Sequence, residues 1–173
     1  ILLGILMEFV FTKITKDDWP FFSRLYGSEK AMQFISVLMT KEQIREAFNS
    51  RLPEWNLSSS HWLCFVIRSK INNTCLGLTG LRLIYQGGEV IAEVGYILSP
   101  EKTGKSIGTK SLAQLLNLPE LASLKKFQAI VTAGNIASER VLEKNGFILT
   151  EILKNNYVIG DVIFDDHVYT LIK

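Results

Sequence analysis

The stretch SPEKTGKSIGTKSL, residues 99–112, decides which fold the rest of the chain is expected to adopt. It follows a strand-like run, opens a helical pattern and contains Gly104, Lys105, Ser106 and Gly108. A helix N-terminus presents unpaired amide N–H groups and a partial positive charge, so it readily binds an anion. Glycine lets a ligand approach the backbone without a Cβ in the way. These features favour a phosphate or pyrophosphate site, and the alternative is a glycine-containing helix cap with solvated lysines.

A P-loop for ATP or GTP is one specific alternative for this stretch. Gly104-Lys105-Ser106 reproduces the end of the G-x-x-x-x-G-K-[ST] motif, but the first glycine would fall at Ser99. A P-loop domain also builds a parallel sheet from βαβ units, whereas this loop follows runs that are joined by short turns. The sequence therefore disfavours a nucleoside triphosphate.

The surrounding pattern predicts one mixed α+β domain. The pairs Asn72-Asn73 and Gly87-Gly88 separate three strand-like runs and favour tight hairpin turns, so an antiparallel meander is expected. Strands are expected at residues 7–15, 61–70, 75–85, 89–99, 127–133, 147–159 and 162–172. Helices are expected from about residue 15 to Tyr26, from Thr40 to Asn49, from the glycine-containing loop to Asn117, and from Ile136 to Lys144.

Composition and the N-terminal run limit the number of domains and the kinds of partner that the chain can have. The chain has 173 residues, 47% of them hydrophobic, and a net charge of +2, which fits one domain and does not indicate a nucleic-acid partner. Cys64 and Cys75 lack metal-ligand spacing, so we expect buried free thiols and no metal. The run ILLGILMEFV has no basic n-region and breaks at Glu8, which argues against a signal peptide or a membrane span. We expect a single domain at residues 7–173, an upstream extension at 1–6, a cytoplasmic location and no membrane partner.

The second informative stretch is GNIASERVLEKNGF, residues 134–147. It resembles the N-x-x-S-x-x-x-[LY]-E-K-x-G-F run of the RimJ/RimL type of acetyltransferase, which acetylates ribosomal-protein N-termini. AEVGYILSPE, residues 92–101, resembles the E-[IV]-G-Y strand and Pro-Glu turn of that branch, as does the closing hairpin with Asp166 and Tyr169. From about Met7 onward, the chain thus resembles the GNAT superfamily of acyl-CoA-dependent N-acetyltransferases. The resemblance implies a central, mostly antiparallel twisted sheet with flanking helices, in which the strand before the Gly-rich loop splays from its neighbour.

The resemblance also implies acetyl-CoA as co-substrate, with its pyrophosphate on the Gly-rich loop. In the family signature [QR]-x-x-G-x-[GA], Gly108 matches, whereas Thr103 replaces Gln or Arg and Ser106 replaces the central glycine. Backbone groups around Ile97 and Leu98 would bind the pantetheine arm. The implied coenzyme-binding residues are Ile97, Leu98, Thr103, Gly104, Lys105, Ser106, Ile107, Gly108, Thr109, Asn135 and Ser138.

Two residues are candidates for the chemistry. Glu93 lies in an apolar strand, where a carboxylate is costly unless it is hydrogen-bonded or lies at a wet cleft. It is interpreted as a general base, directly or through water, and the alternative is a structural carboxylate that caps backbone donors or pairs with Arg82. Many GNAT enzymes place a tyrosine four residues after the position of Ser138, but this chain has Leu142 there. Either Ser138 or water would then protonate the leaving thiolate.

Other polar residues carry weaker signals. His61 and His167 have no nucleophile nearby in the sequence and are expected at strand ends or on the surface. Asp161, Asp165 and Asp166 cluster in the last hairpin, where they either attract a cationic amine or form a solvated turn.

The predicted function is direct acetyl transfer from acetyl-CoA to a primary amine. A protein or peptide N-terminal α-amine is favoured because its pKa of about 7.7–8.0 leaves it partly neutral, whereas lysine titrates near 10.4. Two alternatives remain: a small-molecule amine such as a polyamine or an antibiotic, and a non-catalytic acyl-CoA-binding domain. The protein is expected to be a monomer or a homodimer.

Overall fold

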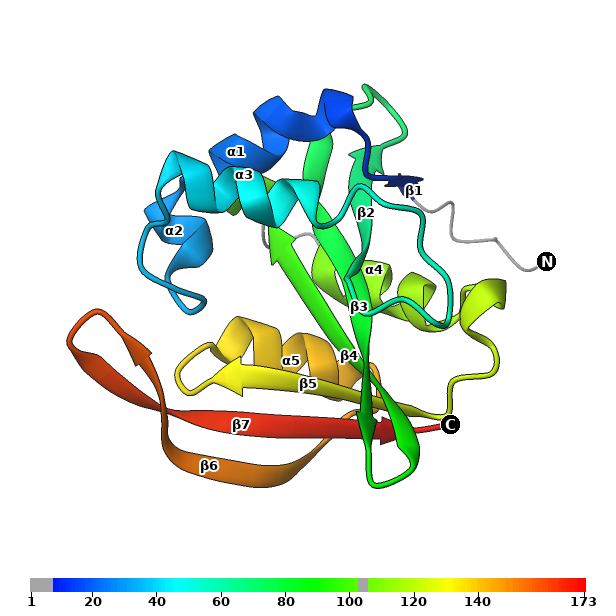
Figure 1. Cartoon of the computed structure of the whole chain (residues 1–173), viewed down its shortest axis with the longest axis vertical. Helices are drawn as coiled ribbons and strands as arrows, with labels where there is room; N and C mark the ends of the chain where they lie inside the picture. The colour runs from blue at the N-terminus through cyan, green and yellow to red at the C-terminus, as the bar shows by residue number, and fades with distance from the viewer. Residues whose placement is uncertain (1–7, 103–105) are drawn as a thin grey trace.

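The computed structural model describes residues 8–102 and 106–173, which form a seven-stranded sheet with helices on both faces (Figure 1). The strand order is β1-β2-β3-β4-β5-β7-β6, and every neighbouring pair is antiparallel except β4 with β5. The strands are β1 Phe9–Lys13, β2 Leu63–Ser69, β3 Cys75–Gln86, β4 Glu89–Leu98, β5 Lys126–Thr132, β6 Ile148–Ile159 and β7 Val162–Ile172. The helices are α1 Trp19–Tyr26, α2 Glu29–Met32, α3 Lys41–Asn49, α4 Ile107–Leu116 and α5 Ile136–Lys144. The α+β prediction is confirmed.

The β2-β3-β4 meander forms as expected from its turn residues. Gly87 and Gly88 join β3 to β4 with φ values of 59° and 80°, in the left-handed region that a tight hairpin turn requires. Gly80 permits the close approach of β2 to β3, because a Cβ at this position would lie 1.8 Å from the carbonyl oxygen of Leu63.

Each face of the sheet carries its own core. On one face, α4 and α5 pack on the sheet through residues that include Leu112, Leu115 and Leu142. On the other face, α1 and α3 pack through residues that include Phe22 and Phe48. Among the described residues, no helix is both long and apolar enough to cross a membrane.

The N-terminal segment differs from the prediction in its details. The helix expected from about residue 15 begins as a 3₁₀ turn at Lys16–Asp18, and α1 starts only at Trp19. The short helix α2 was not predicted, because four residues are too few for a helical period to stand out. The capping box of Thr40 with Gln43 at the start of α3 is confirmed, as are the bounds of α5. Cys64 and Cys75 are both free, but Cys75 is only partly buried, so the expectation of burial is wrong for it.

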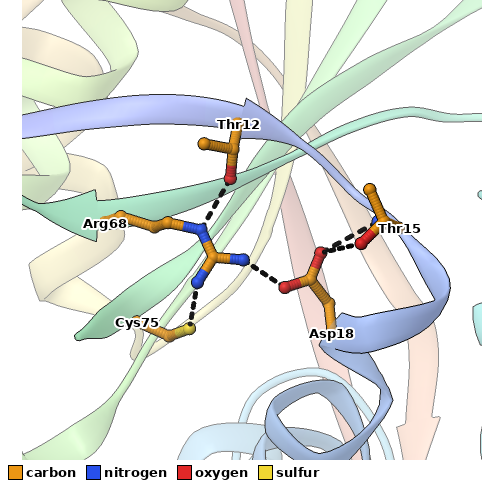
Figure 2. Close-up of polar contacts among 5 residues, drawn as sticks. All are labelled: Thr12, Thr15, Asp18, Arg68 and Cys75. Carbon is orange, nitrogen blue, oxygen red and sulfur yellow. Dashed lines mark hydrogen bonds and ion pairs between the residues drawn. The ribbon is translucent and has the colours of Figure 1, made fainter. Parts of the chain in front are cut away.

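A buried ion pair fixes the segment between β1 and α1 to the sheet (Figure 2). Arg68 of β2 pairs with Asp18, donates from Nε to the Thr12 hydroxyl at 2.8 Å, and contacts the Cys75 sulfur at 3.1 Å. The other Asp18 oxygen accepts the backbone N–H of Thr15 at 2.8 Å. Since α1 follows this turn directly, the network positions one wall of the cleft described below.

Candidate active site

The sheet opens between β4 and β5, as Figure 1 shows. These strands pair only where Ile91–Glu93 lie opposite Lys126–Gln128, and from Val94 onward the β5-facing edge of β4 has no strand partner among the described residues. A cleft with a volume of about 300 Å³ lies at the divergence. Its lining includes Tyr26, Arg51, Glu93, Tyr96, Asn135 and Ser138. The splay that the resemblance implied is thus present, and it falls immediately after Glu93.

Glu93 is buried at the last position of β4 that pairs with β5, and it lines the cleft. One carboxylate oxygen, Oε1, accepts from Arg82 Nη2 at 2.8 Å and Nε at 3.0 Å. The second oxygen, Oε2, lies 3.4 Å from the side-chain amide nitrogen of Gln128 on β5. The predicted alternative pairing with Arg82 therefore exists, yet the carboxylate still borders the cleft. The two interpretations are compatible, because the guanidinium holds the oxygen atoms in place.

Ser138 lines the cleft from the first turn of α5. Asn135 is the N-cap, and its side-chain oxygen accepts the backbone N–H of Ser138 at 3.3 Å. Both predicted residues are therefore brought to the cleft, and the cap fixes the start of the helix. Leu142, one turn further, is fully buried in the core and has no access to the cleft.

Tyr96 of β4 places a phenol hydroxyl beside Ser138 of α5, whereas α5 itself has Leu142 at the position of the usual tyrosine. The Tyr96 oxygen lies 2.8 Å from the Ser138 hydroxyl and 3.1 Å from the Ser138 carbonyl oxygen, to which it donates. Burial raises the pKa of Tyr96 to about 12, although the hydrogen bond with Ser138 lowers it slightly, so the phenol stays neutral at working pH. The sequence analysis did not single out Tyr96. Strand alternation could have done so, because Tyr96 lies three residues after Glu93 and therefore points to the opposite face, toward α5.

The Gly-rich loop is described only in its second half. Thr103, Gly104 and Lys105 lie outside the described residues. Ser106 takes a left-handed conformation with φ 58° and is the N-cap of α4, which then begins at Ile107. In an α-helix the first N–H groups have no carbonyl partner within the helix. The N–H groups at this end of α4 can therefore donate hydrogen bonds to an anion.

Gly108 has a packing role that the sequence analysis did not anticipate. A Cβ at Gly108 would lie 3.1 Å from Val141 of α5 and 3.3 Å from Leu98 of β4. The glycine therefore lets α4 lie close to β4 and α5. The side chain of Ile107 is also buried, in a small cluster with Phe9 and Leu76.

Cys64 lines the cleft but is not suited to act as a nucleophile. Burial raises the pKa of its thiol to about 12, against a small opposing effect of Arg51. At pH 7 the thiolate fraction is then on the order of 10⁻⁵. This argues against an acetyl-cysteine intermediate and favours direct transfer between bound substrates.

The histidine and aspartate candidates lie outside the cleft lining: His61, His167, Asp161, Asp165 and Asp166. Asp165 accepts from Lys154 Nζ at 2.7 Å and Asp166 accepts from the Asn156 side-chain amide at 2.8 Å. His167 pairs with Glu139 at 2.6 Å. Within the described residues, no group of three or more His, Cys, Asp or Glu side chains is placed to hold a metal ion.

A splayed sheet, a carboxylate at the point of divergence and a helix that begins shortly after β4 are features of the class to which the sequence motifs also pointed. Residues 8–148 match the family model described as the acetyltransferase (GNAT) domain, and the chain therefore belongs to this family. It is 32% identical over 105 residues to the probable N-acetyltransferase YjcK of Bacillus subtilis (strain 168). That match covers 60% of this chain and 57% of YjcK, so it spans little more than half of that relative.

Solved structures share the fold at low sequence identity. An acetyltransferase (GNAT family) from Bacillus anthracis is 19% identical, with a TM-score of 0.77 and coverage of 96% of this chain and 95% of that one. Spermidine N-acetyltransferase from Vibrio cholerae, in complex with CoA and spermine, is 18% identical, with a TM-score of 0.79 and 95% coverage of both chains. RimL, a ribosomal L7/L12 α-N-protein acetyltransferase in complex with CoA, is 19% identical, with a TM-score of 0.78 and coverage of 96% and 94%. The GNAT fold is confirmed, and the neighbours include both protein and polyamine acetyltransferases.

Proposed function

We propose that this chain transfers the acetyl group of acetyl-CoA to the N-terminal α-amine of a protein or peptide, as a cytoplasmic enzyme with its catalytic domain at residues 7–173. The observation that carries the proposal is the position of Glu93, whose carboxylate borders the cleft where β4 and β5 separate. The unpaired edge of β4 after Glu93 fits the proposed binding of a pantetheine arm along Ile97 and Leu98. The start of α4 fits a pyrophosphate, with donors from the segment that includes Ser106, Ile107, Gly108 and Thr109.

The proposed chemistry needs only groups that line the cleft. Acetyl-CoA would supply the activated acetyl group. Glu93 takes a proton from the acceptor amine, directly or through one water molecule, and Arg82 keeps the carboxylate oriented. The neutral amine nitrogen attacks the thioester carbonyl carbon, and the C–N bond forms as the C–S bond breaks. Ser138 gives a proton to the departing sulfur on the other side and regains one from solvent, and Tyr96 is a positioning residue that holds the Ser138 hydroxyl.

The charge of the cleft lining supports an α-amine over a polyamine. A polyamine carries several positive charges, and a site for it needs carboxylates to receive them. Of the described residues that line this cleft, Glu93 is the one carboxylate, and it is already paired with Arg82. Arg51 adds a positive charge to the same lining.

The test measures free thiol released from acetyl-CoA in the presence of peptides with free N-termini, the same peptides with blocked N-termini, and spermidine. We expect turnover only with the free N-termini. Turnover with spermidine alone would replace this acceptor class with small amines. Calorimetric binding of acetyl-CoA without any turnover would support the non-catalytic alternative, and ATP serves as the negative control for binding.

A further inference from the structure

Arg51 is a cation in the cleft that the proposed chemistry does not use. It follows the C-terminus of α3 and lines the cleft together with Tyr26, Phe34, Ile35 and Trp62. These residues lie on the α1–α3 side of the sheet, the side toward which Glu93 points, because Ile97 of the same strand face packs there. This part of the lining is therefore the acceptor side of the cleft, opposite Tyr96 and Ser138.

The guanidinium of Arg51 is held in a fixed position. Nη1 donates to the carbonyl oxygen of Ala47 and lies 3.4 Å from the Ser50 hydroxyl, while Nη2 donates to the Tyr26 hydroxyl at 3.1 Å. Its carbon lies 5.5 Å from the centre of the Phe22 ring and 5.7 Å from that of Tyr26. These contacts use three of the five N–H groups of an arginine, and they leave Nε and one Nη2 hydrogen without a partner among the described residues.

The charge of Arg51 also has no ion-pair partner among the described residues. Burial raises the pKa of Tyr26, against a smaller lowering effect of Arg51, so its hydroxyl stays protonated beside the guanidinium. The acceptor side thus offers a planar cation and a neutral hydroxyl close together, and Glu93, the one carboxylate among the described lining residues, is paired with Arg82.

We infer that Arg51, with the Tyr26 hydroxyl, binds a carboxylate of the acceptor, so that the preferred substrate is a peptide with an acidic side chain near its free N-terminus. This inference rests on the proposed function, whose acceptor it narrows. A guanidinium binds a carboxylate through paired N–H donors, and such charge-assisted bonds are stronger than neutral ones. The aromatic and aliphatic residues around Arg51 would contact the apolar part of the same acceptor.

The experiment compares kcat/KM for peptides that differ at one position among the first three, with Glu against Gln and Asp against Asn. We expect the wild-type protein to favour at least one acidic peptide by about 10- to 100-fold, the range of one charged hydrogen-bonded contact. Arg51→Gln should lose this preference. Arg51→Lys should keep part of it, because lysine retains the positive charge but lacks the paired N–H donors of the guanidinium. Arg45→Gln is the matched control, since Arg45 stacks on Trp19 at 3.3 Å and is not part of the cleft lining.

The outcomes separate the inference from the proposed function. Equal rates on acidic and neutral peptides, or an unchanged preference in Arg51→Gln, would overturn the role of Arg51 and leave N-terminal acetylation in place. Failure to acetylate any of the peptides or either free amino acid would overturn both. Free glutamate and glutamine are assayed alongside the peptides, and acetylation of glutamate alone would overturn the peptide assignment while keeping the carboxylate contact. Melting temperatures of all variants identify any that do not fold.

Discussion

Replacing Tyr96 with Phe tests whether a hydroxyl from β4 does part of the work of the tyrosine missing from α5. The substitution removes the contact of 2.8 Å to the Ser138 hydroxyl and leaves the ring in place. A neutral hydrogen bond contributes about 0.5–1.5 kcal/mol, which corresponds to a rate loss of about 2- to 13-fold if it acts only in the transition state. Removing the proposed acid itself, in Ser138→Ala, should cost about 100-fold or more.

The assay combines steady-state kinetics with calorimetric titration of acetyl-CoA. We expect kcat of Tyr96→Phe to fall within the calculated range while the Kd for acetyl-CoA changes little. The double variant with Ser138→Ala should be no slower than Ser138→Ala alone, because without the serine hydroxyl Tyr96 keeps only its bond to the carbonyl oxygen of residue 138, which takes no part in the proton transfer. Losses that simply multiply in the double variant would refute the reasoning, as would a wild-type kcat in Tyr96→Phe. Tyr85→Phe is the control, since its hydroxyl donates to Leu57 at an exposed site outside the cleft lining.

Three further changes test the site and the fold. Glu93→Gln should lower kcat about 100- to 10,000-fold with acetyl-CoA binding retained, as measured by rate assay and calorimetry, and an unchanged kcat would rule out the general base. Cys64→Ala should retain turnover and reduce the loss of stability at alkaline pH. The pKa of the folded Cys64 thiol, about 12, lies above the ordinary 9.0, so the free energy of unfolding of the wild type falls by up to about 1.4 kcal/mol per pH unit between pH 9 and 12. Denaturant titration at several pH values measures this slope in both proteins. Asp18→Ala should lower the free energy of unfolding by about 3 kcal/mol because it leaves Arg68 unpaired, and a loss below about 1 kcal/mol in urea titration would contradict this.

Local signals account for what could be predicted from the sequence. The bounds of α5 followed from an Asn cap at one end and Asn145-Gly146 at the other, and Gly146 indeed has φ 84°. The meander followed from its turn residues, and the start of α3 from its capping box. Each of these features is determined by residues within a few positions of one another. A single sequence is enough to identify such patterns.

The site was predicted less completely because it depends on contacts between distant segments. Glu93 and Ser138 were found from their chemistry and from motif resemblance, and both line the cleft. Tyr96 was missed because its importance comes from a partner 42 residues away. Arg51 was missed because it lies in a polar loop, and only the packing of α1 against α3 brings it beside Tyr26. Strand alternation places Tyr96 on the face opposite Glu93, but nothing in the local sequence of Arg51 signals a cleft.

The divergence of β4 and β5 also explains how one strand can serve both substrates. Successive side chains of a strand point to opposite faces, so Glu93 and Tyr96, three residues apart, necessarily point to opposite sides of β4. In the proposed mechanism Glu93 faces the acceptor side, and Tyr96 faces Ser138, the proposed proton donor, on the coenzyme side. The proposed proton acceptor and the residue that positions the proton donor thus lie on opposite faces of one strand. A shift of β4 by one residue would exchange the two faces and remove both groups from their partners. In the register of β3 with β4, Arg82 lies opposite Glu93 and Thr79 lies opposite Tyr96. The proposed chemistry therefore requires this register as well as the side chains themselves.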